Sequence, residues 1–216
     1  ALFEKAYAKI SGNYKHLEWG FNSYALHRMS GGPINYSYVP SLTTDELWDQ
    51  LLSYTNRDDI VSLLSKAAPE GVTDVWHTSP NGITVDHAYS ALRDKEHYDK
   101  TRLVLVRNPF AWEKYTGPWS DSSDKWTDAF RKEVGGHTSA NDGSFWMDID
   151  TVAKEFEYTG MNVVETAGLQ QAEIVVIDDD TPDMGKAGCA YCVEHEFTID
   201  SPVDQTVHVF FHTWSW

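Results

Sequence analysis

The chain has 216 residues, a hydrophobic fraction of 41% and nine tryptophans, which suffices for a buried core and excludes the disordered class. Its formal net charge of −16 excludes nucleic acid and anionic membranes as direct electrostatic partners. No apolar run approaches the length of a transmembrane helix, so we expect no transmembrane segment.

Short helices and loops are predicted at the start of the chain. Residues 1–10 carry apolar side chains at helical spacing and predict an amphipathic helix. Loop signals follow, including the Gly-Gly-Pro stretch at 31–33. The aromatic residues of the alternating run 34–39 then predict a short strand.

A second helix is predicted over residues 43–54, because Thr43 and Glu46 have the spacing of a capping box and apolar residues follow. Residues 59–67 fit either a helix or a buried strand. We favour the strand, since a predicted hairpin lies further along the chain and offers it a partner.

The hairpin comprises two predicted strands, residues 83–92 and 102–109, and Asn81-Gly82 forms a tight turn before the first. Both faces of the second strand are apolar until its end, which predicts a central strand covered on both sides. Short helices are predicted over residues 123–134 and 148–156.

From residue 163 onward the pattern changes to strand-like runs separated by Asp, Pro and Gly, which indicates the start of an all-β unit. The only two cysteines, Cys189 and Cys192, lie in this region. One Cys-x-x-Cys pair is no disulfide framework, and it favours a reducing compartment. Ordinary buried thiols are a better interpretation than a redox pair or a zinc site.

His87 on the first hairpin strand and Asn108 at the end of the second are candidates for catalysis. Cysteine hydrolases of the Cys-His-Asn type need an imidazole base and an amide oxygen that orients it. Neighbouring strands bring such side chains within reach, because cross-strand neighbours are about 5 Å apart. A hydrogen-bonded core histidine and an ordinary Asn-Pro turn explain the same residues, so this pattern alone leaves both interpretations open.

Three motifs narrow the choice: "DHAYSAL", "RNPFAWEKYTGPWSD" and "DGSFWMDID" occur in this order. Together they resemble the second half of the calpain catalytic core, over residues 1–162. The resemblance implies an α+β fold of the papain-like kind, with an antiparallel sheet and flanking helices. Residues 163–216 then correspond to the first strands of a C2-like β-sandwich domain.

The resemblance implies that His87 is the catalytic base and Asn108 its orienting residue. The family's nucleophilic cysteine and an oxyanion-binding glutamine belong to a separate, preceding half, and this chain contains neither segment. We therefore expect a cysteine endopeptidase fragment that is inactive as given and becomes active only if an upstream half supplies the cysteine. A calpain-like scaffold without proteolytic activity, associated with the cytoskeleton, is the alternative.

Calcium is the cofactor that the resemblance raises, since this half of the calpain core binds one ion. Asp121 and Asp142 match two of the family's ligands, whereas Lys114 and Ser144 stand where carboxylates are expected. Calcium takes six to eight oxygen ligands and favours carboxylate charge. We therefore expect this site to bind calcium weakly or not at all.

Three further departures from the family lie beside the candidate catalytic residues: Phe110 replaces a Trp, Ala111 a Gly and Asp86 a Gly. Phe fills space but lacks the indole N–H. An acid before His87 raises the pKa of the imidazole if its carboxylate comes close, although strand alternation predicts that it points to the opposite face.

The expected partner is a polypeptide substrate or a binding protein, with no role for nucleic acid. We expect a cytoplasmic location, with the cytoskeleton as an alternative. Because residue 1 is Ala rather than Met, we also expect the chain to be part of a longer protein or of a larger assembly.

Overall fold

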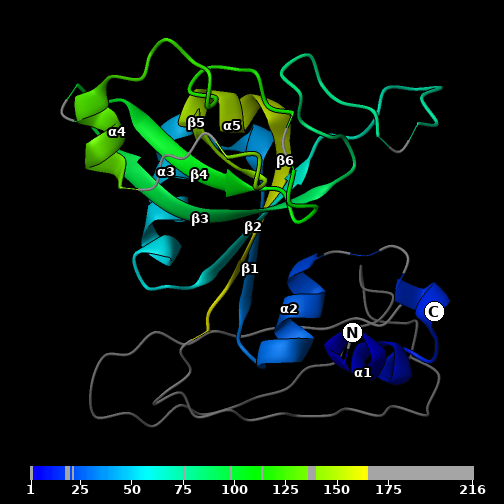
Figure 1. The fold of residues 1–216 in the computed structure, drawn as a ribbon. Coiled ribbons are helices and arrows are strands. Elements are labelled where there is room, and N and C mark those ends of the chain that lie inside the picture. The colour runs from blue at the N-terminus through cyan, green and yellow to red at the C-terminus, as the bar shows by residue number, and fades with distance from the viewer. Residues whose placement is uncertain are drawn as a thin grey trace, which may run out of the picture. The chain divides into compact units, whose positions relative to one another are not determined.

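A computed structural model of the chain describes residues 2–17, 20, 22–74, 76–97, 99–112, 114–135 and 140–164. Within them the fold is α+β, with six strands in one sheet and five α-helices around it (Figure 1). The predicted start of a β-sandwich lies outside the described residues, apart from its first two residues, because residues 165–216 are not described. Both cysteines also lie outside the described residues. None of the described helices is long and apolar enough to cross a membrane.

The α-helices are α1 (Leu2–Ile10), α2 (Asn22–Ser30), α3 (Thr44–Thr55), α4 (Asp128–Val134) and α5 (Ile149–Glu155). There are also two short 3-10 helices: η1 (Tyr14–Leu17) lies between α1 and α2, and η2 (Val39–Ser41) precedes α3. The strands are β1 (Ile34–Tyr38), β2 (Ile60–Ser65), β3 (Ala88–Glu96), β4 (Arg102–Arg107), β5 (Ser144–Asp148) and β6 (Phe156–Asn162).

The sheet has the order β1-β6-β2-β3-β4-β5, and all neighbouring strands are antiparallel. Strand β4 lies between β3 and β5, as its two apolar faces predict. Residues 59–67 do contain a strand, β2, which pairs with β3 as expected. The interpretation of residues 59–67 as a strand is therefore confirmed.

One face of the sheet packs against α3 and α5. Val104 and Val106 of β4 share this core with Leu47 and Leu51 of α3 and with Val152 of α5. Helix α3 begins as predicted, because the Thr43 side chain accepts a hydrogen bond from the Glu46 N–H and the Glu46 carboxylate accepts one from the Thr43 N–H. The capping box thus fixes where this covering helix starts.

The other face of β4 carries Leu103 and Leu105, which pack against Trp126 and Phe130 in a second, smaller core. Helix α4 was predicted to begin at residue 123, but it begins at Asp128, after the N-cap Thr127. The preceding residues form turns that bring Trp126 into this core. Both faces of β4 are therefore buried, and its position in the sheet is fixed by side chains alternating between the two cores.

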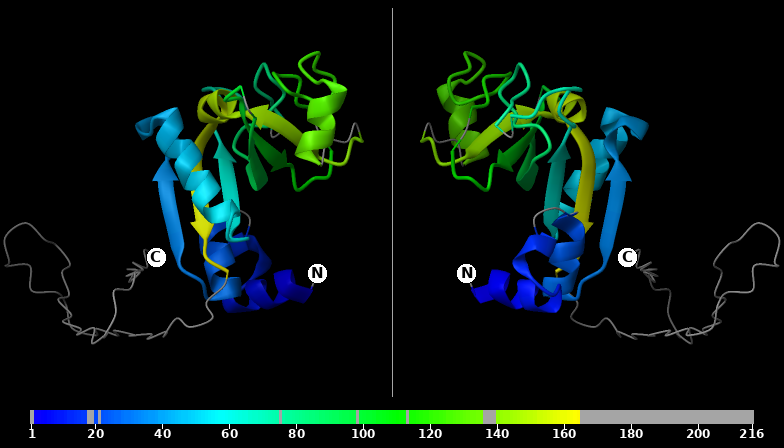
Figure 2. Two further views of the ribbon diagram at one scale, coloured as in Figure 1. Left: turned by 90° about the vertical axis from the view of Figure 1, so that its left-hand side faces the viewer. Right: turned by 90° about the vertical axis from the view of Figure 1, so that its right-hand side faces the viewer.

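Helices α1 and α2 lie at the end of the described fold away from α4 (Figures 1 and 2). Helix α1 forms as predicted, yet Leu2, Phe3 and Ile10 are largely exposed to solvent. Helix α2 was not predicted. It packs against β6 at Gly160, where a Cβ atom would lie 1.8 Å from the Ser23 hydroxyl, so only glycine permits this approach.

Candidate active site

His87 and Asn108 lie at the same end of the β3–β4 hairpin, each one residue outside its strand. The first strand was predicted to begin at residue 83, but β3 begins at Ala88. Asp86 has a φ of 49°, which an extended strand does not allow, and the chain turns there before it enters the sheet. His87 therefore lies at the end of the sheet where the interior strand β3 starts.

The backbone of His87 is held on both sides by Ser65, the last residue of β2. The Ser65 hydroxyl accepts a hydrogen bond from the His87 N–H at 2.9 Å and donates one to the His87 carbonyl at 3.0 Å. The Ser65 N–H donates a further bond to the same carbonyl at 2.9 Å. These contacts fix the backbone from which the imidazole projects.

The imidazole of His87 contacts the side chain of Asn108, with 3.0 Å between Nε2 and Oδ1. Because Oδ1 is an acceptor, this contact requires a proton on Nε2 and leaves Nδ1 of the neutral ring as the acceptor. Asn108 is 2% exposed, and its Oδ1 also accepts a hydrogen bond from the Phe110 N–H at 3.0 Å. The carboxamide is thus held in the orientation that selects this tautomer.

Gly143, just before β5, contacts the backbone of Asn108. Its carbonyl accepts the Asn108 N–H at 2.8 Å, and its φ is 87°. A Cβ atom at this position would lie 2.8 Å from the Asn108 carbonyl oxygen and 2.9 Å from Cα of Ala111. Glycine is needed here both for its positive φ and for this close approach.

Aromatic rings surround the imidazole. The Phe110 ring stacks on it with centroids 4.4 Å apart and an angle of 18°, and Tyr89 meets it edge-on at 5.0 Å. Burial lowers the pKa of His87 below its usual 6.5, while the hydrogen bond to Asn108 acts in the opposite direction. The ring is therefore kept neutral near pH 7, as a proton acceptor must be.

Asp86 does not act on the imidazole. Its carboxylate accepts a hydrogen bond from the Ala68 N–H at 2.9 Å, and its charge is not among the causes of the His87 pKa shift. The expectation that it points away from the histidine is consistent with this contact. Ala111, at a φ of 57°, and Asp86, at 49°, both have a left-handed backbone, which suits the glycines that the calpain resemblance implies at these positions.

The loop before His87 and the loop after Asn108 are tied together. The Thr116 N–H donates to the Asn81 carbonyl at 2.9 Å, and the Asn81 side chain donates to Glu155 at 2.7 Å. Gly82 packs against the Lys114 backbone so closely that a Cβ atom would lie 1.8 Å from its carbonyl oxygen.

Asp121 and Asp142, the two candidate calcium ligands, lie near each other. Burial first, and then the charge of Asp142, raise the pKa of Asp121 to about 6, while the charge of Arg131 lowers it. One oxygen of Asp142 already accepts the Ser144 N–H at 2.8 Å. In the part of the chain that the structure describes, no three His, Cys, Asp or Glu side chains gather as metal ligands.

The Lys114 ammonium group lies over the Trp112 ring, 5.0 Å from its centroid, in a cation–π contact. Ser144 offers a hydroxyl where the calpain resemblance implies a carboxylate. A donor set of two carboxylates with a nearby Arg fits calcium poorly, because this ion needs many oxygen ligands of net negative charge. The neighbouring Glu113 lies outside the described residues.

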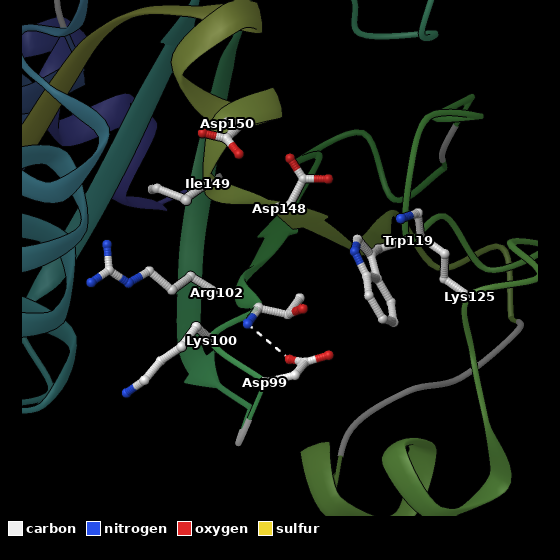
Figure 3. Close-up of a pocket in the computed structure, with 9 residues that line it drawn as sticks. Asp99, Lys100, Arg102, Trp119, Lys125, Asp148, Ile149 and Asp150 are labelled. Carbon is white, nitrogen blue, oxygen red and sulfur yellow. Dashed lines mark hydrogen bonds between the residues drawn. The ribbon is translucent and has the colours of Figure 1, made fainter.

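A pocket of about 300 Å³ lies at the opposite end of β4 from Asn108 (Figure 3). Two of its charged groups are already engaged: Arg102 bonds to Asp45 and Glu96, and Asp148 accepts the Thr151 N–H as the N-cap of α5. These contacts explain the charges as supports of α5 and the β3–β4 turn. We therefore do not assign chemistry to this pocket.

Sequence reasoning missed two tryptophans that lie beside Phe110, the exposed Trp76 and the half-buried Trp112. Their centroids are 5.4 Å and 6.1 Å from that of Phe110. The spacing of Phe110 and Trp112 at alternate positions was a usable signal, but nothing in the sequence connects Trp76 to them. It comes from a separate loop, 34 residues before Phe110.

A neutral imidazole held by a buried carboxamide at the end of a hairpin is the geometry of cysteine proteases of the Cys-His-Asn type. Residues 1–162 match the calpain family of cysteine proteases, and the chain belongs to that family. The match covers both His87 and Asn108.

The chain is similar to several calpains. It is 40% identical over 154 residues to the calpain-type cysteine protease DEK1 of Arabidopsis thaliana, covering 68% of this chain and 7% of that protein. It is 30% identical over 177 residues to calpain-5 of Mus musculus, covering 72% and 27%, and 32% identical over 166 residues to calpain clp-1 of Caenorhabditis elegans, covering 73% and 20%. The chain thus spans less than a third of each of these relatives.

Proposed function

We propose that this chain carries the histidine and asparagine of a cysteine endopeptidase that cleaves polypeptides. The observation that carries the proposal is the 3.0 Å contact between His87 Nε2 and Asn108 Oδ1. The family membership and the lowered pKa of His87 support it. Asn108 is the orienting residue, and His87 is the base and then the acid.

The tautomer defines the steps. Nδ1 of His87 takes the proton of a cysteine thiol, and the thiolate attacks the carbonyl carbon of the substrate. The imidazolium then returns that proton to the leaving amine as the peptide C–N bond breaks, which leaves a thioester. Nδ1 then takes a proton from a water molecule, which attacks the carbonyl carbon of the thioester. The C–S bond breaks, and the imidazolium returns the proton to the sulfur, which regenerates the thiol. Through these steps Asn108 keeps the ring oriented and stabilises its charged form.

The sulfur is proposed to come from a polypeptide segment that this sequence does not contain. Neither Cys189 nor Cys192 lies in the residues that match the family, 1–162. The chain as given is therefore expected to hydrolyse no peptide, which a fluorogenic casein assay measures.

A chimera tests the proposal directly. Residues 1–162 replace the matching segment of the Arabidopsis relative, and casein hydrolysis is compared with that of the relative itself. We expect activity that His87→Ala reduces by at least about 10³-fold, because the base is lost. Asn108→Ala reduces kcat more than KM, since it alters orientation and leaves substrate contacts in place. A folded chimera without activity, beside an active relative, contradicts the proposal.

A non-proteolytic scaffold that binds a protein partner, in the cytoplasm or on the cytoskeleton, is the second candidate. The substitutions Phe110, Ala111, Lys114 and Ser144 favour it, because they alter the surroundings of the histidine and the calcium segment. The imidazole and carboxamide nevertheless keep a geometry that a scaffold does not need. We therefore prefer the peptidase.

We further propose that calcium binds weakly or not at all to Asp121 and Asp142. The support is the ammonium of Lys114, directed onto Trp112, and the missing carboxylate at Ser144. A calcium requirement would then have to be met elsewhere in the complete enzyme.

A further inference from the structure

Three aromatic rings lie side by side next to the candidate catalytic histidine, and we name them the aromatic platform: Trp76, Phe110 and Trp112. Trp76 is 5.4 Å from Phe110 and 6.0 Å from Trp112, measured between ring centroids. Phe110 in turn stacks on His87 at 4.4 Å. The platform is therefore continuous with the imidazole that we assign to catalysis.

The platform is open to solvent. Trp76 is 50% exposed and Phe110 is 46% exposed, although large aromatic rings are usually mostly buried. Adjacent exposed aromatic rings are typical of surfaces that bind a partner, because covering them removes much apolar area from water.

The indole ring of Trp76 is not needed to hold its loop in place. Backbone hydrogen bonds from Ser79 to Ile83, at 2.7 Å, and from Val85 to His77, at 3.1 Å, close this loop on itself. The backbone N–H of Trp76 donates a hydrogen bond to the Asp74 carboxylate at 2.9 Å. Since the backbone is anchored without the indole, packing of the loop does not explain why this ring is tryptophan.

We infer that the aromatic platform is a substrate subsite that binds a bulky apolar side chain of the polypeptide, with Trp76 as a specificity-determining residue. The inference rests on the proposed function, which brings a peptide carbonyl to His87, and the Phe110 ring lies against that imidazole with centroids 4.4 Å apart. The occupant is an aromatic or large aliphatic side chain, because the two half-exposed rings offer apolar area and little hydrogen bonding.

Trp112 and Lys114 set the limit of the subsite. The Lys114 ammonium lies 5.0 Å from the Trp112 centroid and so covers part of that ring. The open apolar area therefore belongs mainly to Trp76 and Phe110, and Trp112 supports them from the side. A positive charge on the substrate side chain is disfavoured here, because it meets the like charge of Lys114.

The test uses the chain as it exists and requires no nucleophile. Two uncharged probes, acetyl-Gly-Gly-Phe-Gly-Gly-amide and its counterpart with Ala for Phe, are titrated into the isotope-labelled chain. The indole N–H signals of Trp76 and Trp112 are followed by NMR after assignment with Trp76→Phe and Trp112→Phe. We expect the Phe peptide to shift both signals and to bind at least about fivefold more tightly than the Ala peptide.

Variants of the chain then distinguish binding at the aromatic platform from non-specific binding of an apolar peptide. Trp76→Ala is expected to lose the preference for the Phe peptide, and Trp76→Phe to retain most of it. Tyr38→Ala is the matched control, because Tyr38 is 46% exposed on β1, at the far edge of the sheet, and its removal is expected to change nothing.

Equal affinities of the two peptides for the wild-type chain overturn the inference, whether or not any variant folds. So does an unchanged preference in a folded Trp76→Ala chain. Because this titration measures binding alone, an inactive chimera refutes the proposed function without altering the result here. An active chimera with no peptide preference at the platform refutes the subsite and leaves the function intact.

Discussion

Ser65 and His87 are joined through three hydrogen bonds, two of which use the serine hydroxyl. Ser65→Ala leaves the His87 carbonyl bonded to the residue 65 N–H but deprives the His87 N–H of its partner. We expect a loss of about 1–2 kcal/mol in the free energy of unfolding, measured by urea denaturation. Ser53→Ala, at an exposed site on α3, is the control and is expected to change stability by less than about 0.5 kcal/mol.

The imidazole of His87 is expected to titrate below its usual pKa of 6.5, because burial disfavours its charged form. The unfolded chain then binds this proton more readily, so His87 lowers stability as the pH falls below 6.5 and has no such effect above it. Proton NMR of the ring measures the titration. Phe110→Ala exposes the ring and is expected to move its pKa upward, and a wild-type midpoint at or above 6.5 contradicts the prediction.

Asp94 on β3 is a half-buried carboxyl group whose pKa is raised to about 6 by its partial burial, despite a hydrogen bond with Thr55. The Thr55 hydroxyl also contacts the Leu51 carbonyl at 3.1 Å, and its single proton cannot serve both acceptors. A protonated Asp94 resolves this, since it donates to Thr55 while Thr55 donates to Leu51. The fold thus favours the neutral acid.

Asp94→Asn is therefore expected to stabilise the protein at pH 7 by about 1–3 kcal/mol. The wild type is most stable, with respect to this group, below pH 3.8, and it loses that stability as the pH rises towards 6. The advantage of the variant should disappear near pH 4. Urea denaturation at both pH values measures the difference, with Asp124→Asn at an exposed position as the control.

Ala111 has a φ of 57°, which costs a residue with a Cβ atom about 1 kcal/mol relative to glycine. Ala111→Gly is expected to raise the Tm by about 2–4 °C in thermal unfolding. Ala153→Gly, inside α5, is expected to lower it, because glycine weakens a helix. An equal fall in both variants would show that the left-handed backbone at residue 111 carries no strain.

Calcium affinity is expected to appear when the missing carboxylates are restored. The wild-type chain should show no micromolar binding in calorimetric titration, whereas the double variant Lys114→Glu, Ser144→Glu should bind at least about tenfold more tightly. Lys132→Glu, a comparable charge change on α4, is the control and should not bind calcium. Micromolar binding by the wild type that depends on Asp121 and Asp142 would show that the ammonium of Lys114 is no obstacle.

The sequence predicted the elements whose signals are local. The capping box at Thr43 and Glu46 marked the start of α3, and the two apolar faces of 103–106 marked a strand between two cores. The His87–Asn108 contact depended on a hairpin whose turn signals are local, although β3 and β4 shift register between Ala91 and Arg93.

Elements without such signals were missed or misplaced. Strands β5 and β6 were not predicted, because Ser144–Asp148 is buried on both faces without alternation and Phe156–Asn162 contains Gly160. The start of β3 was wrong because an acidic residue, Asp86, takes a left-handed backbone that glycine more often signals. The aromatic platform could not be predicted, because its rings come from loops that meet only in the folded chain.

Gly82, in the turn before His87, lies at a position where the neighbouring loop restricts which residue can stand. A single methyl group there would collide with the carbonyl of Lys114, in the loop that follows Asn108. Replacements at that glycine should consequently meet both this clash and backbone strain, whereas replacements at Gly71, which faces open space, should meet only the strain of its positive φ. Both glycines have a positive φ, so the difference in tolerance between them comes from the backbone of Lys114, which lies against Gly82 and has no counterpart at Gly71.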